Sequence, residues 1–320
     1  MRRPLRLLTT SRVPGYLRGL SALDARVDVV VPRDEGLGAW WARVAELPAG
    51  ARPVTEARAA TGLQRGAYDV AVVHDVADLE VFASERVPAV LVQHEPRALA
   101  DLMGDGPDRW SESRRALVAR TQVVYPSAWV AESWGLDGEV IRPAIDPRAW
   151  PLGDGSLPRA LTVLPFAVER DAIGTGRALR EVSAGLPMTV LGLNPGLGVP
   201  HDTAQWSARR QALASHRLYL NLSIAPYEPA LPSAMLEAMA SGLPVVTIAH
   251  PGTPIEHGVN GFVCADAGEI RARVLDLLGD ATLATRLGTA ARASVLRNFH
   301  PEACANAWTA LIDGRLRRAA

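Results

Sequence analysis

The feature that most constrains this chain is a repeated alternation of short apolar runs with helical segments. Ten runs have the length and the Val, Leu and Ile content of strands, and they are residues 6–10, 27–32, 68–75, 88–95, 121–127, 160–166, 188–193, 218–223, 243–250 and 261–265. Helical spacing of apolar residues occurs between them, in stretches such as 97–120, 173–185, 207–216, 232–241, 267–278 and 301–313. Apolar strands separated by helices are typical of parallel sheets that are covered on both faces. The pattern therefore predicts an α/β protein.

A change in composition divides the chain in two. Residues 139–160 contain four prolines and little periodicity, which is typical of an exposed linker. We therefore expect two doubly wound Rossmann-like domains, residues 1–150 and 151–300, that face each other across a cleft. A last helix, within 301–320, is expected to pack back on the first domain. Ligands of such sheets bind beyond the carboxyl ends of the strands, so residues that directly follow strands are the candidates for a site.

Charge and cysteine content narrow the classes of partner. The formal net charge is zero, so nothing indicates a nucleic acid as partner. The chain has no lysine, so any cation that holds a phosphate here is an arginine, which offers a two-pronged fork of donors. Cys264 and Cys304 match no metal-binding spacing. No run approaches the ~20 apolar residues of a membrane-spanning helix, so we expect a cytoplasmic protein, with peripheral membrane association left open.

One apolar stretch carries a single charge. In LPSAMLEAMASGLPVV, residues 231–246, that charge is Glu237. Pro232 or Ser233 begins the predicted helix, and Ser233 and Glu237 lie four residues apart on one face, beside small residues such as Ala234. Two interpretations follow. Glu237 points to solvent, or it binds the hydroxyls of a ligand whose phosphates lie at the N-terminus of the helix.

Four segments together resemble a known family. They are 123–147 (VVYPSAWVAESWGLDGEVIRPAIDP), 231–247 (LPSAMLEAMASGLPVVT), 250–263 (HPGTPIEHGVNGFV) and 298–312 (NFHPEACANAWTALI). In this order they resemble the GT-B glycosyltransferases, in particular the retaining GT4-like family, also called group 1. The resemblance covers roughly residues 120–313, and residues 1–119 resemble the family only in topology. It implies transfer of a sugar from a nucleotide-diphosphate-sugar donor to an acceptor, with retention of configuration, no metal ion and no further cofactor. The acceptor, whether small molecule, glycan, lipid or protein, is not identified by the sequence.

The resemblance also implies donor-binding residues around the helix with one charge. Glu237 would bind the ribose hydroxyls of the donor. Pro232, Ser233 and Ala234 would bring the first backbone amides of the helix to the diphosphate or the sugar.

Two loops complete the implied donor pocket. Gly252 and Thr253 lie in the loop after the next strand and would line the same pocket. In the first domain, residues 9–19 (TTSRVPGYLRG) occupy the family's glycine-loop position. There Gly15 would let the backbone approach the phosphates, because glycine adopts conformations that other residues avoid.

The chain departs from the family pattern at two places. The family has two glutamates spaced E-x7-E, but Pro229 stands eight residues before Glu237, and Glu228 is one residue off. Either the loop bulges so that Glu228 acts near the donor sugar, or that role is lost. The family's Arg and Lys after the first donor-domain strand are also missing. Arg170 is the nearest substitute and Arg177 the next. Arg170 with a helix terminus would compensate the charge of a diphosphate leaving group, or it is a surface charge.

Two histidines of the first domain follow strands. His94 stands where the family often has a histidine that contacts the donor sugar near the bond being broken, so His94 is the predicted catalytic residue on the acceptor side. Glu95, beside it, and His74 are predicted to lie on the same side. The alternative is that His74 and its neighbour Asp75 are structural.

Two other classes of function remain open at this point. The weak phosphate cations and the shifted glutamate also fit a nucleotide-sugar-binding subunit with poor catalysis. A GT-B-type sugar-nucleotide epimerase is the third interpretation. Such enzymes typically carry more acidic residues and histidines in the cleft than this sequence offers.

Overall fold

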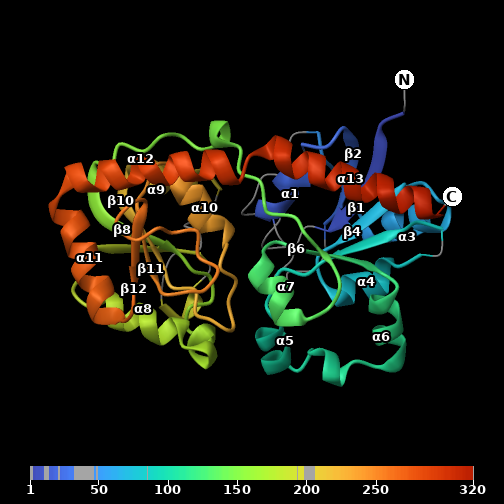
Figure 1. The fold of residues 1–320 in the computed structure, drawn as a ribbon, viewed down its shortest axis with the longest axis horizontal. Helices are drawn as coiled ribbons and strands as arrows, with labels where there is room; N and C mark the ends of the chain where they lie inside the picture. The colour runs from blue at the N-terminus through green and yellow to red at the C-terminus, as the bar shows by residue number, and fades with distance from the viewer. Residues whose placement is uncertain are drawn as a thin grey trace. The chain divides into compact units, whose positions relative to one another are not determined.

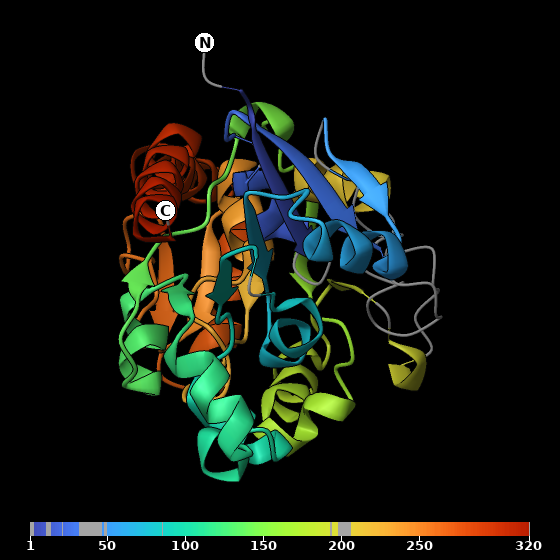
Figure 2. The same ribbon diagram turned by 90° about the vertical axis from the view of Figure 1, so that its right-hand side faces the viewer.

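The computed structural model describes residues 3–10, 14–20, 22–31, 47, 50–84, 86–192, 194–197 and 206–319. The chain divides into two compact units. Unit 1 consists of Met1–Ala144 with Pro301–Ala320, and unit 2 of Ile145–His300. Figures 1 and 2 give two views of the ribbon.

The described part of unit 1 contains a seven-stranded sheet with strand order β3-β2-β1-β4-β5-β6-β7, in which every pairing is parallel. Its strands are β1 (Leu5–Thr10), β2 (Ala25–Val30), β3 (Arg52–Val54), β4 (Val70–Val73), β5 (Ala89–Val92), β6 (Gln122–Tyr125) and β7 (Glu139–Val140). Its helices are α1 (Pro14–Leu20), α3 (Glu56–Gln64), α4 (Val76–Phe82), α5 (Arg97–Met103), η1 (Pro107–Arg109), α6 (Glu112–Ala119), α7 (Ala128–Trp134) and α13 (Pro301–Ala319). The order is that of a doubly wound sheet that reverses direction between β1 and β4.

The described part of unit 2 contains a second parallel sheet, of five strands, in the order β12-β11-β10-β8-β9. Its strands are β8 (Leu157–Val163), β9 (Met188–Leu191), β10 (His216–Asn221), β11 (Val245–Ile248) and β12 (Gly261–Cys264). Its helices are η2 (Pro147–Ala149), η3 (Glu169–Ile173), α8 (Thr175–Ser183), η4 (Pro195–Leu197), α9 (Trp206–Ser215), α10 (Ser233–Ala240), α11 (Ala267–Gly279) and α12 (Ala281–Asn298). The chain reverses direction between β8 and β10.

Each sheet has an apolar core on both faces. In unit 1, one core joins the sheet to α1 and α13, and the other joins it to α3, α4, α6 and α7. Trp308 of α13 is fully buried in the first of these. In unit 2, α9 and α10 cover one face and α8 and α11 the other, while α12 contributes to both. The predicted fold class, an α/β protein with two doubly wound Rossmann-like sheets, is confirmed; that the two face each other across a cleft stays a prediction.

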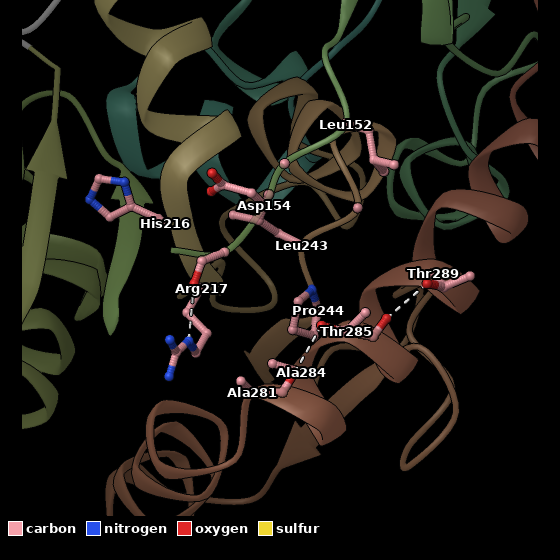
Figure 3. Close-up of a pocket in the computed structure, with 13 residues that line it drawn as sticks. Leu152, Asp154, His216, Arg217, Leu243, Pro244, Ala281, Ala284, Thr285 and Thr289 are labelled. Atoms are coloured by element: carbon pink, nitrogen blue, oxygen red, sulfur yellow. Dashed lines mark hydrogen bonds between the residues drawn. The ribbon is translucent and has the colours of Figure 1, made fainter. Parts of the chain in front are cut away.

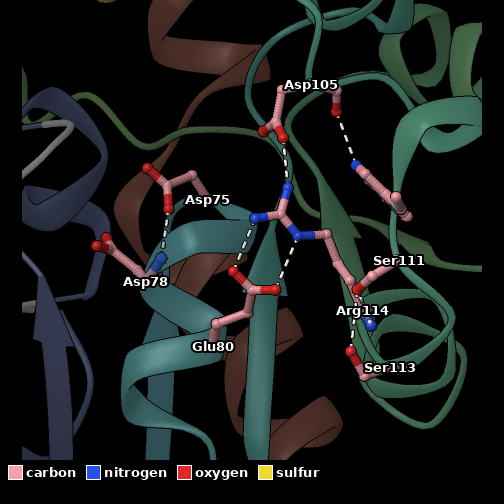
Figure 4. A network of polar contacts seen from close by, with 8 residues as sticks. Asp75, Asp78, Glu80, Asp105, Ser111, Ser113 and Arg114 are labelled. Carbon is pink, nitrogen blue, oxygen red and sulfur yellow. Dashed lines mark hydrogen bonds and ion pairs between the residues drawn. The ribbon is translucent and has the colours of Figure 1, made fainter.

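Helix starts follow from the sequence. Side chains of Asp75, Ser111, Ser127 and Asp266 each accept a hydrogen bond from a backbone N–H in the first turn of α4, α6, α7 and α11. Such caps satisfy donors that the helix itself leaves unpaired. In unit 1, Asp75 therefore begins α4 directly after β4, and this sets the position of the strand end (Figure 4).

The stretch 139–160 is not an exposed linker throughout. Its first two residues form β7 at the edge of the unit 1 sheet, and Leu157 already begins β8 of unit 2. Ile141 and Trp150 are buried. The prolines of this stretch mark turns in a connection whose apolar side chains pack into the two units.

Candidate functional site

The carboxyl edge of the unit 2 sheet carries a buried carboxylate. Glu228, in the loop after β10, is 4% exposed. One of its oxygens, Oε1, accepts a hydrogen bond from Nη1 of Arg170. The other, Oε2, accepts from the Thr175 hydroxyl and, over 3.0 Å, from the backbone N–H of Ile224. A buried carboxylate needs this kind of pairing to offset its lost hydration.

Arg170 lies half-buried beside Glu228. It belongs to η3, in the connection after β8, and its side chain is 35% exposed. Its Nε donates to the Pro165 carbonyl over 3.1 Å, and Nη1 donates to Glu228. Within the described residues Nη2 makes no hydrogen bond. Since a guanidinium has five N–H donors, Arg170 is fixed in place and keeps donors for a ligand.

The two predicted catalytic residues of this unit therefore lie together, at the point between β8 and β10 where the sheet order reverses. Because such reversal points leave a crevice at the carboxyl ends of the strands, they are the usual ligand sites of doubly wound sheets. The alternative of Arg170 as a plain surface charge does not fit its ion pair with buried Glu228.

A histidine that the sequence analysis did not single out joins two loops at this edge. His250 is buried, and its Nδ1 accepts a hydrogen bond from the backbone N–H of Gly252 over 3.2 Å. Its Nε2 therefore carries the proton and donates to the Glu228 carbonyl over 3.0 Å. Burial lowers the pKa of His250, which keeps the ring neutral. The backbone N–H of Thr253 donates to the His250 carbonyl over 3.1 Å. Through these bonds His250 holds the loop with Gly252 and Thr253 close to the loop that carries Glu228.

The start of α10 adds unpaired donors. Pro232 caps this helix without a side-chain hydrogen bond, and Ser233 and Ala234 are its first two residues. In the described part of the chain their backbone N–H groups donate to no acceptor, as is usual for the first turn of a helix. These groups and the positive end of the helix dipole favour an anion.

Glu237, one turn further along α10, is 2% exposed and forms a buried ion pair with Arg209 of α9. The interpretation in which Glu237 points to solvent is therefore wrong. Arg209 was not predicted, because nothing in the sequence relates a residue of one helix to a carboxylate of another. Its Nε is buried and has no hydrogen-bond partner among the described residues.

The carboxyl edge of the unit 1 sheet carries a chain of hydrogen-bonded polar side chains. The Thr9 hydroxyl, at the end of β1, lies 2.9 Å from Nε2 of His74, and Nδ1 of His74 lies 2.8 Å from Nε2 of His94. The Tyr16 ring meets the His94 ring edge to face, with centroids 4.9 Å apart. Burial lowers the pKa of His94 to about 3, so its imidazole is neutral near pH 7. The two predicted histidines are thus brought together by β4 and β5.

The remaining predictions for unit 1 are placed as follows. The Glu95 side chain is exposed, and its carbonyl accepts a hydrogen bond from the Trp134 indole over 2.8 Å. Gly15 lies in the first turn of α1, which begins at Pro14, so the expectation of a loop over 9–19 is wrong for residues 14–19. Proline favours the first helical position because its fixed φ suits the helix. Residues 11–13 of that segment lie outside the described residues.

A network of ion pairs holds the helix that follows His74. Asp75 caps α4, and Glu80 of α4 accepts from Nε and Nη2 of Arg114 over 2.8 and 2.7 Å. Figure 4 shows the Arg114 guanidinium between Glu80 and Asp105, which it also pairs with. The network ties α4 to α6 and to the loop before η1. It supports the position of His74 from outside the candidate site.

A hollow at the opposite, amino edge of the unit 2 sheet has no comparable chemistry. It has a volume of about 270 Å³ (Figure 3). Its lining comes from four segments: residues 152–155, the start of β10, residues 242–244 and helix α12. Its arginine, Arg217, donates to the carbonyls of Gly155 and Leu278 over 3.1 and 2.8 Å. Because that charge is used to hold the chain together, we place the candidate site at the carboxyl edges.

The two parallel doubly wound sheets have the architecture of the GT-B fold. Residues 173–280 match the family described as "Glycosyl transferases group 1". The match covers about a third of the chain and shows that unit 2 is similar to this family. It agrees with the resemblance seen in the sequence. No curated protein matches the sequence.

Solved structures agree on the fold. HepE of Anabaena, in complex with UDP and glucose, has a TM-score of 0.66 at 16% identity, and the match covers 97% of this chain and 100% of HepE. Sucrose-phosphate synthase from Thermosynechococcus elongatus has a TM-score of 0.65 at 16% identity and full coverage of both chains. TarM of S. aureus has a TM-score of 0.57 at 15% identity, with 76% of this chain covered. The chain spans only about half of TarM, 55% of its length. At these identities the likeness shows the fold alone.

Within the described residues, every helix falls short of the length and apolarity that a membrane-crossing helix needs.

Proposed function

We propose that this protein transfers a sugar from a nucleotide-diphosphate-sugar donor held by unit 2 to an acceptor held by unit 1. The observation that carries the proposal is the Arg170–Glu228 pair at the reversal point of the unit 2 sheet. A sugar nucleotide breaks its sugar–phosphate bond only if the negative charge that develops on the diphosphate is stabilised. A cation that is held by a buried carboxylate and still has donors available meets that need.

The diphosphate would lie between Arg170 and the start of α10. Arg170 supplies a charged fork, and the N–H groups of Ser233 and Ala234 supply neutral donors at the positive end of a helix. Glu228 then acts as a positioning residue for Arg170, because both of its oxygens are occupied by protein donors. This role replaces the direct contact with the donor sugar that the family pattern implies.

We further propose that the transfer retains the anomeric configuration and needs neither a metal ion nor another cofactor. Retention is proposed from the resemblance to the retaining family. The absence of a metal ion is proposed from the set of fixed donors just described, which does by itself what a metal ion does for a diphosphate in other transferases. His94, neutral and held by His74, would contact the sugar near the bond being broken. The role of the enzyme is then to position the reactants and to stabilise the leaving group.

Glu237 remains the proposed ribose ligand, with one added condition. Its carboxylate is buried against Arg209, so a ribose reaches it only when the start of α10 opens locally. A carboxylate has about four acceptor positions, so the ion pair with Arg209 and a ribose contact are compatible. Gly252 and Thr253 would line the same pocket, because His250 holds their loop against the Glu228 loop.

The donor is proposed to be a UDP-sugar. HepE, which shares the fold over its whole length, was solved with UDP-glucose. The acceptor class stays open among small molecules, glycans, lipids and proteins.

A thermal-shift panel with UDP-, GDP-, ADP- and dTDP-sugars tests the proposal, because a ligand that binds only the native state raises the melting temperature. We expect one nucleotide class to raise the melting temperature of the wild type and of the Arg177→Ala control. The same nucleotide should raise the melting temperature of the Arg170→Ala variant much less. Release of free nucleotide with an acceptor extract, and the identity of the sugar product, then separate a transferase from a binding subunit and from an epimerase. No stabilisation by any sugar nucleotide would remove the central support of the proposal.

A further inference from the structure

Unit 1 contains a cavity that the proposed transfer does not use. It has a volume of about 580 Å³ and lies between α3 and the amino ends of β1, β2 and β3. Its lining residues are Arg6, Arg26, Val27, Asp28, Gly50, Arg52, Arg58, Thr61, Gly62, Arg65, Ala67 and Tyr68. Because all strands of this sheet are parallel, the cavity is at the edge opposite to His74 and His94. A volume of this size is within the usual range for small-molecule sites.

The strand register places two arginines side by side on the floor of the cavity. Arg6 of β1 is the direct partner of Arg26 in β2, so both side chains leave the sheet on the same face. Like charges that stand directly opposite each other destabilise a sheet. Asp69 pairs with Arg6, so the charge that lacks a partner among the described residues on this floor is that of Arg26.

Helix α3 supplies the facing wall. Arg58, Thr61, Gly62 and Arg65 follow one another at spacings of three, one and three, so they share one face of the helix. A Cβ atom on Gly62 would lie 2.6 Å from the Tyr68 ring, so glycine lets this ring pack closely against α3. Arg58 and Arg65 are thus two further arginines in the lining of the same cavity.

The carboxylates nearby pair with only two of the five arginines that line the cavity, Arg6 and Arg52. Asp28 is taken by Arg52, with contacts of 2.9 and 2.7 Å, and by the Tyr68 hydroxyl at 3.1 Å. Asp69 pairs with Arg3 at 2.7 Å and with Arg6 at 3.2 Å.

The other three arginines of the cavity, Arg26, Arg58 and Arg65, form no ion pair with any residue in the described part of the chain. The lining therefore has an excess of positive charge, although the whole chain has a net charge of zero.

One donor on the floor has no acceptor. Nε of Arg6 is buried and has no hydrogen-bond partner among the residues that the structure describes. Buried donors in proteins are nearly always paired, so the protein alone does not satisfy the polar groups around this floor completely.

We propose that this cavity binds a phosphate-bearing anion. Guanidinium groups match the geometry of phosphate oxygens in two-pronged contacts, and here they converge from a sheet and a helix. The anion comes either from a soluble phosphorylated compound or from the headgroup of an anionic lipid. The cavity is separate from the residues proposed to hold the sugar nucleotide, so the inference stands or falls independently of the proposed function.

The test is calorimetric titration of inorganic pyrophosphate into the full chain. All proteins carry Arg170→Ala, so that binding at the unit 2 sheet does not contribute. The cavity variant adds Arg26→Ala, Arg58→Ala and Arg65→Ala, three exposed arginines whose loss leaves the core intact. The matched control instead adds Arg86→Ala, Arg109→Ala and Arg297→Ala, which are also exposed and remove the same charge. Melting temperatures verify that all variants are folded.

The same proteins are sedimented with phosphatidylglycerol vesicles, with pure phosphatidylcholine vesicles as reference. We expect the cavity variant to bind pyrophosphate, the vesicles or both roughly tenfold more weakly than the control. Loss of the pyrophosphate affinity alone identifies a soluble ligand, and loss of vesicle binding identifies a lipid headgroup. The proposal is overturned if the control protein binds neither pyrophosphate nor the vesicles, or if both triple variants are weakened equally.

Discussion

The carboxyl edges of the two sheets have the same place in the same type of fold but carry different polar groups. In unit 2 the edge is ionic, since buried Glu228 holds Arg170 and Glu237 holds Arg209. In unit 1 the edge carries a hydrogen-bonded chain of Thr9, His74 and His94. Beside it the Asp78 carboxylate accepts a hydrogen bond from the Thr10 hydroxyl over 2.7 Å. An edge with a cation and spare N–H donors suits a diphosphate, and an edge of imidazole and carboxylate groups suits hydroxyl groups of a sugar or an acceptor. The difference assigns different partners to two similar sheets.

The largest effect among the tests of this comparison is expected for the turnover of an Arg170 variant. Arg170→Ala removes the cation proposed to stabilise the leaving diphosphate, so turnover should fall by roughly 10²–10³-fold. The measurement is release of nucleotide from the donor class found in the thermal-shift panel. Arg177→Ala is the matched control, because Arg177 is an exposed arginine of α8 that forms only a loose pair with Glu181, at 4.0 Å. Equal activity of the two variants would contradict an ionic donor edge.

The second effect concerns the Arg209–Glu237 pair. Glu237→Ala leaves the Arg209 guanidinium buried and unpaired, so we expect a loss of about 3 kcal/mol in the free energy of unfolding. Replacing both residues, as Arg209→Met with Glu237→Leu, should recover most of that loss, because buried pairs cost desolvation that apolar residues avoid.

Denaturant titration of the wild type, the single variants and the double variant measures the coupling. Additive losses would mean that the pair is not a unit. A nucleotide-induced stabilisation that survives in the folded double variant would exclude Glu237 as the ribose ligand.

The third effect tests the carboxyl edge of the unit 1 sheet. His94→Ala should lower turnover by about one to two orders of magnitude and leave the nucleotide dissociation constant unchanged, since unit 1 is assigned to the acceptor side. Steady-state rates and nucleotide calorimetry on the same preparation measure both quantities. A variant that loses nucleotide binding along with turnover would show that the two edges do not divide the work in this way.

The smallest effect is a dependence of stability on pH. Burial lowers the pKa of His94, His216 and His250 in the folded protein. Below the ordinary histidine pKa of about 6.5, the unfolded chain then binds more protons than the folded one, so stability falls as the pH falls. At pH 5.5 the His94 imidazole should cost on the order of 1 kcal/mol relative to pH 7.5, and His216 and His250 should act in the same direction.

Melting temperatures between pH 7.5 and 5.5 measure this slope. A folded His94→Gln variant should have a smaller slope than the wild type, because one of the three imidazoles is gone. The carboxylates whose pKa is lowered, such as Asp69, change stability only in a more acidic window. A melting temperature that is constant over this range would contradict neutral, buried imidazoles.

Much of the fold could be predicted because its strands are long apolar runs. All ten predicted runs overlap strands, from β1 at Leu5–Thr10 to β12 at Gly261–Cys264. β3 and β7 were missed because they have three and two residues, too few for a pattern to emerge, and both lie at sheet edges. Gly15 was assigned to a loop because the helix that contains it has only seven residues.

The site was predictable where it depends on strand ends and not where it depends on packing between helices. Arg170 and Glu228 follow β8 and β10, and the reversal of the sheet brings them together. His250 follows β11 and could have been found by the rule that selected His74 and His94. Arg209 could not, because its partner is fixed only when α9 and α10 pack on the same face of the sheet.

The central claim is that Arg170, held by Glu228, forms the diphosphate site of unit 2. The most direct measurement is the dissociation constant of UDP, by calorimetry, for the wild type and for folded Arg170→Ala and Arg177→Ala variants. The account predicts that Arg170→Ala weakens UDP binding by roughly tenfold or more while Arg177→Ala leaves it unchanged. Equal UDP affinity in all three proteins would contradict the claim.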